Sequence, residues 1–193
     1  NKAANVFYNA GLRKGDKVMV IRKRHYEFWI VSVALHKLGI TMIPATHMLT
    51  VKDLIYRMEC SQAKGFICTP NDGVPQKVLE TLEKTNLPCK LWSVQKDVKG
   101  FENLTTAMES ADSNLSRVTT KSDEHMLLYF TSGTTGYPKG VIHDFSYPLA
   151  HIVTAKYWHC AERDGLHFTI SDTGWGKALW GKLYGQWMCE GGV

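Results

Sequence analysis

The chain has 193 residues, of which 44% are hydrophobic and 21% charged, and this composition excludes disorder, collagen and coiled coil. Its longest apolar run, 28–35, contains Ser32 and falls far short of the roughly 20 residues that cross a bilayer, so no membrane span is expected. The net charge of +5 suits a polyanionic ligand. We expect no nucleic-acid partner, and we interpret the basic run 22–24 as a solvated loop edge.

Strand-like and helix-like patterns alternate through residues 1–95, which we expect to form a first α/β layer. Strands are predicted at 18–21, 40–43, 66–68 and 90–94, and helices at 26–38, 51–60 and 74–84. Thr50 is suited to cap the second helix, with Asp53 at its third position, and Pro75 opens the third helix. The alternation predicts an α/β fold, a doubly wound parallel sheet flanked by helices.

Residues 96–123 are rich in Ser, Thr, Asn and Asp, and we expect them to form a polar connection with one short helix at 104–110. Residues 124–193 are then expected to start a second α/β layer. Its predicted elements are an apolar strand at 126–130, a β-like run at 141–142, a helix at 146–159, a strand at 166–170 and a helix at 178–189.

Metal binding is not indicated by the cysteines or the histidines. The five cysteines are scattered without a CxxC pair, which favours a reducing compartment over a metal site. His143, His151, His159 and His167 recur every eight residues, but eight helical steps leave an offset of about 80 degrees. These four therefore cannot converge on one ion, and His143 alone has positional support for a functional role.

The segment 131–140, TSGTTGYPKG, has the composition of a phosphate-binding loop. Its glycines permit positive φ and close approach, so that backbone N–H groups can converge on anionic oxygens. Its hydroxyls donate further hydrogen bonds, and Lys139 adds a positive charge. The alternative is a flexible Ser/Thr/Gly hairpin turn, but such a turn does not predict the ordered Pro-Lys-Gly ending.

The loop is not the P-loop of nucleoside triphosphatases. That motif has Gly before its Lys and Ser or Thr after it, whereas here Pro138 precedes Lys139 and Gly140 follows. A P-loop also leads directly into a helix, while this segment lies between an apolar strand and another β-like run. The sequence therefore predicts a different phosphate-binding loop.

Residues 131–140 resemble the signature loop of the adenylate-forming superfamily, which contains acyl-CoA synthetases, luciferases and peptide-synthetase adenylation domains; nine of ten positions fit. The resemblance extends over essentially the whole chain. Residues 49–57 and 171–175 are similar to the medium-chain acyl-CoA synthetases in particular. The resemblance implies that the chain is a partial N-terminal domain of the adenylate-forming fold, without the family's C-terminal domain.

The resemblance implies an AMP-forming acyl-CoA synthetase. A small or medium-chain carboxylic acid would react with ATP to give an acyl-adenylate, and the acyl group would then pass to coenzyme A. Mg²⁺ would be held mainly by the phosphates. The residues implied to hold the ATP phosphates are Thr131, Ser132, Gly133, Thr134, Thr135, Gly136 and Lys139, and of these Lys139 and Thr131 are the implied catalytic residues. The chain alone is expected to be inactive.

Two further sites rest on the same resemblance. Gly174, Trp175 and Gly176 fall where the family shapes its acyl pocket, with plain core packing of Trp175 as the alternative. Lys177 departs from the family pattern, because an ammonium in an apolar pocket is costly to desolvate. His47 and Met48 are weak candidates for the coenzyme A channel, and an ordinary surface loop is equally compatible with them.

Two other functions stay open at this stage. One is a non-catalytic nucleotide-binding module; the other is an adenylating enzyme for an aryl or amino acid, which residues 171–175 disfavour. The chain begins at Asn1 and shows no secretory signal, so we expect that its true start is missing. The expected compartment is the cytoplasm, or the mitochondrial matrix if the source is eukaryotic. The oligomeric state is not predicted.

Overall fold

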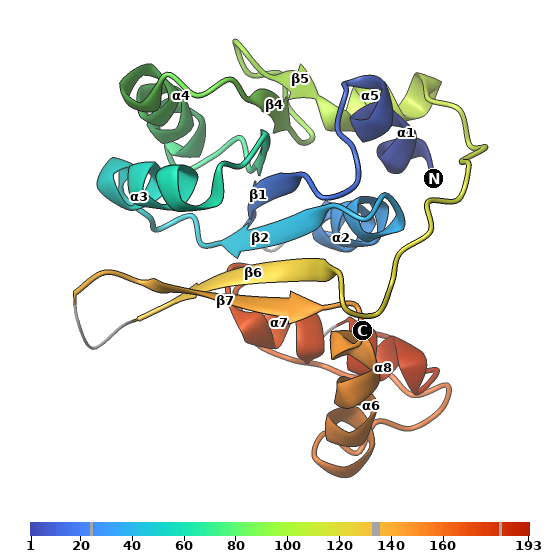
Figure 1. The fold of residues 1–193 in the computed structure, drawn as a ribbon. Coiled ribbons are helices and arrows are strands. Elements are labelled where there is room, and N and C mark those ends of the chain that lie inside the picture. Colours follow the sequence, from blue (N-terminus) through green and yellow to red (C-terminus); the bar gives the residue numbers. More distant parts are fainter. Residues whose placement is uncertain (24, 133–135, 182) are drawn as a thin grey trace.

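The computed structural model describes residues 1–23, 25–132, 136–181 and 183–193, in which seven strands form one sheet with the order β5-β4-β3-β1-β2-β6-β7 (Figure 1). The strands are β1 Lys17–Ile21, β2 Thr41–Ala45, β3 Gly65–Cys68, β4 Lys90–Ser93, β5 Glu102–Asn103, β6 His125–Thr131 and β7 Lys139–Asp144. The helices are α1 Lys2–Asn9, α2 Glu27–Lys37, α3 Val51–Ser61, α4 Val74–Thr85, α5 Leu104–Ser110, α6 Tyr147–Tyr157, α7 Gly176–Trp180 and α8 Tyr184–Met188.

The sheet is covered by helices on both faces, because its strands are apolar on both sides. In β1, Val18 and Val20 belong to one core cluster, and Met19 and Ile21 belong to the other. The first cluster includes buried residues of α1, α2, α5 and α7, while the second includes those of α3 and α4. A strand buried on both faces is typical of a doubly wound sheet, so the predicted fold class is confirmed.

Residues 124–144 continue the first sheet, which differs from the second layer we expected. Strand β6 pairs in parallel with β2, with Met42 opposite Leu127, and β7 then pairs antiparallel to β6. The short turn between β6 and β7 permits only this antiparallel hairpin, since a parallel strand needs a long crossover. The carboxyl ends of the parallel strands β1, β2, β3 and β6 lie along one edge of the sheet.

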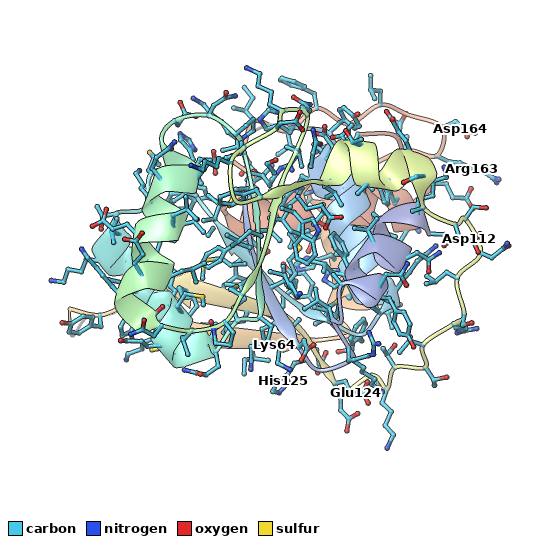
Figure 2. The ribbon with its side chains drawn as sticks, turned by 90° about the horizontal axis from the view of Figure 1, so that it is seen from above. Lys64, Asp112, Glu124, His125, Arg163 and Asp164 are labelled. Carbon is cyan, nitrogen blue, oxygen red and sulfur yellow. The ribbon has the colours of Figure 1, made fainter. Side chains whose placement is uncertain are left out.

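The opposite edge carries the amino ends of those strands. Lys64, Glu124 and His125 precede or begin strands β3 and β6, and Figure 2 labels all three at this end of the sheet. Lys64 forms an ion pair of 2.6 Å with Asp16, and Glu124 forms one of 2.7 Å with Lys14. This edge is therefore bordered by two ion pairs, in which the lysines are the more exposed partners.

Local sequence signals explain the starts of some helices in the first 110 residues. The hydroxyl of Thr50 accepts from the backbone N–H of Asp53, and the Asp53 carboxylate accepts from the backbone N–H of Thr50, which confirms the predicted cap of α3. Pro75 lies in the first turn of α4, and α5 matches its predicted bounds. The sequence reasoning missed α1 and the two-residue strand β5.

Three expectations are corrected. Residues 166–170 form no strand, and only an isolated bridge joins Leu166 to Gly192. The helix predicted at 178–189 is replaced by the short helices α7 and α8, separated near Gly181. Arg22 is not at a solvated edge: it is fully buried and pairs with buried Glu27 at 2.9 Å, because β1 carries it into the interior. No helix in the described ranges is long and apolar enough to span a bilayer.

Candidate functional site

The predicted phosphate loop connects β6 to β7 at the carboxyl edge of the sheet, where ligands bind in open α/β sheets. Figure 1 shows this hairpin extending beyond the neighbouring strands. Thr131 lies opposite Lys139, and its hydroxyl donates to the Lys139 carbonyl oxygen at 3.5 Å. Ser132, Gly136 and the side chains of both paired residues are exposed, so these four residues are accessible to a ligand. Of the residues assigned to the phosphates, Gly133, Thr134 and Thr135 lie outside the described residues.

The second half of the loop is held against α3. The hydroxyl of Tyr56 donates to the carbonyl oxygen of Pro138 at 2.9 Å, and the rings of Tyr56 and Tyr137 stack with centroids 5.0 Å apart. Gly136 has a φ of +95°, which a residue with a Cβ rarely adopts. Tyr56 thus positions the turn that carries Lys139. Sequence reasoning missed it, because a single aromatic side chain in a helix gives no sign of the loop that it contacts.

Arg57, next to Tyr56 on α3, supports the strand that leads into the loop. Its guanidinium lies 5.2 Å from the ring centroid of Phe130 on β6, and its Nη1 donates to the Asp53 carbonyl oxygen. Partial burial lowers its pKa from the usual value, but a guanidinium stays protonated at neutral pH. The contact fixes the orientation of Phe130, one residue before Thr131.

A pocket of about 680 Å³ joins the base of this hairpin to the second predicted site. Thr131 and Ser132 line it together with Gly174, Trp175 and Gly176, although the two segments are far apart in sequence. Trp175 keeps 60% of its surface exposed, so plain core packing does not describe it. The remaining lining residues are Tyr129, Phe130, Val141, His143, Tyr147 and His151.

The segment before Trp175 is fixed to the carboxyl ends of β1 and β2. The buried hydroxyl of Thr173 donates to the Arg22 carbonyl oxygen at 2.5 Å. A Cβ on Gly174 would lie 2.3 Å from the backbone nitrogen of Thr46, so only glycine permits this approach. The Gly174 N–H donates to the Asp172 carboxylate at 2.9 Å. The Asp-Thr-Gly sequence thus brings Trp175 to the pocket.

The two weak coenzyme A candidates lie beside that segment and not among the pocket lining. Nδ1 of His47 is 3.6 Å from Oδ2 of Asp172, so a protonated His47 would form an ion pair there. Met48 is 63% exposed. Lys77 on α4 donates to the carbonyl oxygens of His47 and Leu49 and fixes this loop. These contacts describe an ordered surface loop, and a coenzyme A role for either residue stays a prediction.

Four rings line one wall of the pocket in a row. Centroid distances are 5.8 Å from Tyr129 to His143, 4.5 Å from His143 to Tyr147 and 4.4 Å from Tyr147 to His151. We call these four residues the ring wall. Burial lowers the pKa of His143 and His151 and raises the pKa of Tyr147 to about 12. The ring wall is therefore polar and uncharged at neutral pH.

The four histidines that recur every eight residues form two pairs in the structure. His143 and His151 belong to the ring wall, whereas the ring of His159 lies 5.0 Å from that of His167. Among the described residues, no three His, Cys, Asp or Glu side chains are placed to hold a metal ion. Lys177 lies in α7 with an exposed side chain and is not among the residues that line the pocket.

Curated relatives match almost the whole chain. The chain is 37% identical over 188 residues to the mitochondrial acyl-coenzyme A synthetase ACSM3 of Mus musculus, covering 96% of the chain and 32% of that protein. It is 36% identical over 190 residues to the mitochondrial acyl-coenzyme A synthetase ACSM4 of Homo sapiens, covering 97% and 33%. The chain thus spans about a third of the length of these curated relatives.

The fold is shared with a solved structure of the anthranilate CoA ligase AuaEII in complex with anthranoyl-AMP. The TM-score is 0.86 at 20% identity, and the match covers all of this chain and 37% of the other. The sequence model of a family described as AMP-binding enzyme matches residues 1–183. Because that match includes nearly every described element, the chain belongs to the AMP-binding enzyme family.

Proposed function

We propose that the protein containing this chain is an AMP-forming acyl-CoA synthetase, a ligase that activates a small or medium-chain carboxylic acid with ATP and transfers the acyl group to coenzyme A. One observation supports this most strongly: the phosphate-loop residues Thr131 and Ser132 line the same pocket as Gly174–176. An acid and a triphosphate could therefore meet there. The names of relatives that match almost the whole chain favour the acyl-CoA branch.

The first step is nucleophilic displacement at phosphorus. A carboxylate oxygen attacks the α-phosphorus of ATP, the bond to the bridging oxygen breaks, and pyrophosphate leaves with the electron pair. Negative charge grows on the leaving group, so preorganised donors and a cation stabilise the transition state. The exposed hydroxyls of Thr131 and Ser132 and the ammonium of Lys139 would supply them, because β6–β7 pairing holds Thr131 opposite Lys139. Gly133, Thr134, Thr135 and Gly136 would add loop donors in the same proposal.

Mg²⁺ would enter with the nucleotide and be held mainly by phosphate oxygens, where it neutralises charge on the triphosphate. The described residues fit this arrangement, since they supply hydroxyls and an ammonium at the loop and no cluster of metal-binding side chains. In the second step the coenzyme A sulfur attacks the acyl carbonyl carbon, and AMP leaves. Coenzyme A would approach the acyl-adenylate near His47 and Met48.

The acid would lie between Trp175 and the ring wall, with Gly174 and Gly176 leaving room for it. The family's acyl-CoA relatives carry the word mitochondrial in their names, which supports the mitochondrial matrix as the compartment if the source is eukaryotic. Nucleic acid has no role in this proposal.

The test is acid-dependent exchange of pyrophosphate into ATP, measured with the longest reading frame that contains this chain. Exchange is expected with at least one short or medium-chain acid. Lys139→Ala should slow exchange about 10- to 100-fold, the size of a lost charge-assisted contact. Lys99→Ala is the matched control and should have no effect, because Lys99 is an exposed lysine that precedes β5 and does not line the pocket. ATP binding without exchange for any acid in a broad panel would refute the enzyme and favour a nucleotide-binding module.

A further inference from the structure

Tyr56 of α3 holds the turn that leads into Lys139 by two separate contacts. Its hydroxyl donates to the carbonyl oxygen of Pro138 at 2.9 Å, and its ring stacks on that of Tyr137 with the planes 27° apart. A hydrogen bond with the Cys60 thiol, one helical turn on, raises the pKa of Tyr56, so its hydroxyl keeps its proton at neutral pH and can donate. The backbone just before Lys139 is therefore fixed to α3.

The strand that leads into the loop is held by the same turn of α3. The Arg57 guanidinium lies 5.2 Å from the ring centroid of Phe130, and the ring of Tyr56 meets that ring edge-on with centroids 6.2 Å apart. Arg57 is itself restrained, because only 8% of its surface is exposed and its Nη1 donates to the Asp53 carbonyl oxygen at 3.0 Å. Phe130, which directly precedes Thr131, is therefore fixed to α3 as well.

The hairpin needs these contacts because its own strands hold this end weakly. Figure 1 shows that it extends beyond the neighbouring strands, and a two-stranded hairpin is only marginally stable by itself. Thr131 and Lys139 pair with each other, but both are exposed, and the Thr131 hydroxyl lies 3.5 Å from the Lys139 carbonyl oxygen, at the limit of a hydrogen bond. Contacts from α3 thus restrain where these two residues lie.

We propose that Tyr56 and Arg57 are positioning residues that set the placement of Thr131 and Lys139 for the displacement of pyrophosphate. We call these two residues the α3 clamp. Donors stabilise developing charge only when they are already in place, and a misplacement of about 1 Å can slow a reaction about 100-fold. Neither clamp residue is among those that line the pocket, so the clamp acts through the loop. This proposal rests on the function proposed above.

The first experiment measures acid-dependent pyrophosphate exchange by the longest reading frame that contains the chain. Tyr56→Phe keeps the ring and removes the hydroxyl, so kcat/KM for ATP should fall about threefold to tenfold. Tyr56→Leu combined with Arg57→Met should lower it about 30- to 100-fold. KM for the acid should change less than about twofold, because the pocket lining is intact. Urea denaturation of each variant separates lost positioning from lost folding.

Tyr8→Phe is the matched control for the hydroxyl. Tyr8 is an exposed tyrosine of α1, which packs on the opposite face of the sheet from α3. This change should leave kcat/KM for ATP unaltered. A loss in Tyr8→Phe equal to that in Tyr56→Phe would contradict the clamp.

A second experiment asks whether the clamp acts through Lys139. In a Lys139→Ala background the added change Tyr56→Phe should lower kcat/KM for ATP less than about twofold, because the ammonium that Tyr56 positions is already gone. Losses that multiply in full would show that Tyr56 acts elsewhere, and they would overturn the proposal.

Trypsin provides a readout that needs no activity, because Lys139-Gly140 and Lys99-Gly100 are the same kind of peptide bond, each at an exposed lysine. Cleavage within a paired strand requires local opening. Tyr56→Leu should therefore speed cleavage after Lys139 about tenfold relative to cleavage after Lys99, as followed by mass spectrometry.

The outcomes distinguish the clamp from the proposed function. Unchanged exchange kinetics and an unchanged ratio of the two cleavage rates would overturn the clamp while the proposed function stands. Absence of exchange in the unmodified protein for every acid in a broad panel would refute the proposed function and the role of the clamp in it. The cleavage rates would then still decide whether Tyr56 holds the loop.

Discussion

The chain has two regions that differ in burial. The first region comprises strands β1 to β6 with helices α1 to α5, and the second region runs from β7 to α8. Strands β2 and β3 are buried at every residue, whereas four of the six residues of β7 are exposed. In α6 only Ala155 is buried, while Leu149, Val153 and Tyr157 are more than half exposed. The predicted phosphate loop connects these two regions. The sheet thus positions one side of the pocket, and β7 and α6, which bury little of their surface within this chain, supply the other.

The difference shows that an apolar pattern specifies an element only when a partner covers it. Residues 166–170 have the composition of a buried strand, but Leu166 and Phe168 are each 84% exposed and Ile170 is 74% exposed. A strand needs a neighbour for its backbone hydrogen bonds. Within the described part of the chain, this segment has only the bridge to Gly192. Stability should therefore depend strongly on contacts in the first region and weakly on those in the second.

The largest effect is expected at the buried ion pair of the first region. Arg22 and Glu27 are both fully buried, and burial lowers the pKa of Arg22 to about 10, so the guanidinium stays charged at pH 7. Glu27→Ala would leave that charge unpaired and should reduce the free energy of unfolding by about 3–5 kcal/mol. Urea denaturation measures it.

The matched pair in the second region is Arg163 with Glu190, 2.5 Å apart and exposed. Glu190→Ala should cost less than about 1 kcal/mol. The double variant Arg22→Met with Glu27→Leu should recover most of the loss in the first region, because it removes both charges. Equal costs for Glu27→Ala and Glu190→Ala would contradict the comparison.

The free energy of unfolding should depend on pH through His36, which lies where the two regions are in contact. The ring of His36 on α2 is buried, forms a hydrogen bond with the Tyr184 hydroxyl of α8, and has its pKa lowered to about 3 by burial. Because free histidine titrates near 6.5, the unfolded chain binds more protons between pH 6.5 and 3. Stability should therefore fall as pH drops below 6.5, by up to about 1.4 kcal/mol per pH unit from this residue.

His36→Phe should flatten that slope in urea denaturation measured at pH 7, 6 and 5. His125→Phe, a change at an exposed histidine, should leave the slope as it is in the unmodified chain. Burial also lowers the pKa of His25, so some slope should persist in the His36 variant. An unaltered slope in His36→Phe would show that this residue is not the coupling point.

Gly174→Ala tests how tightly the second region is fixed to the first. The new Cβ would overlap the backbone of Thr46, so residues 171–176 would have to move. A destabilisation of about 1–3 kcal/mol is expected, as for overpacked sites. Gly192→Ala is the control, because its Cβ would meet only ordinary contacts with Leu166 and Gly165. Similar urea midpoints for the two variants would argue against a fixed segment.

The smallest loss of stability is expected from removing a helix cap, and α3 and α6 provide the comparison. Thr50→Ala removes the side-chain hydrogen bond that caps α3 and should cost about 1 kcal/mol. Ser146 occupies the same position in α6 but makes no side-chain cap hydrogen bond, so Ser146→Ala should cost clearly less. Thermal unfolding of the two variants in parallel decides this. A larger loss from Ser146→Ala would reverse the order.

The first region was predictable from the sequence because its signals are local and agree with its burial. Thr50 with Asp53, and Pro75, mark helix starts that depend on neighbouring residues only. The order of strands along the sheet was not predictable, since the pairing of β6 with β2 joins residues far apart in the chain. Arg22 was misplaced because a run of basic residues gives no sign that one member points inward.

The candidate site was partly predictable. The composition of 131–140 indicated phosphate chemistry, and the family resemblance indicated Gly174–176, but neither pattern placed them in one pocket. His143 had positional support, but Tyr56 and the other three ring-wall residues were missed, because their role comes from contacts between separate elements that no short motif encodes. Single aromatic and histidine residues have too many uses to be assigned from sequence alone.

Nucleotide titration of the longest reading frame that contains this chain tests the central claim most directly. The hairpin between Thr131 and Lys139 should bind the phosphates, so Mg-ATP should bind at one site, and Lys139→Ala should weaken that binding about tenfold while leaving adenosine binding unchanged. Calorimetry that shows no ATP binding, or equal ATP affinity in both proteins, would contradict the account.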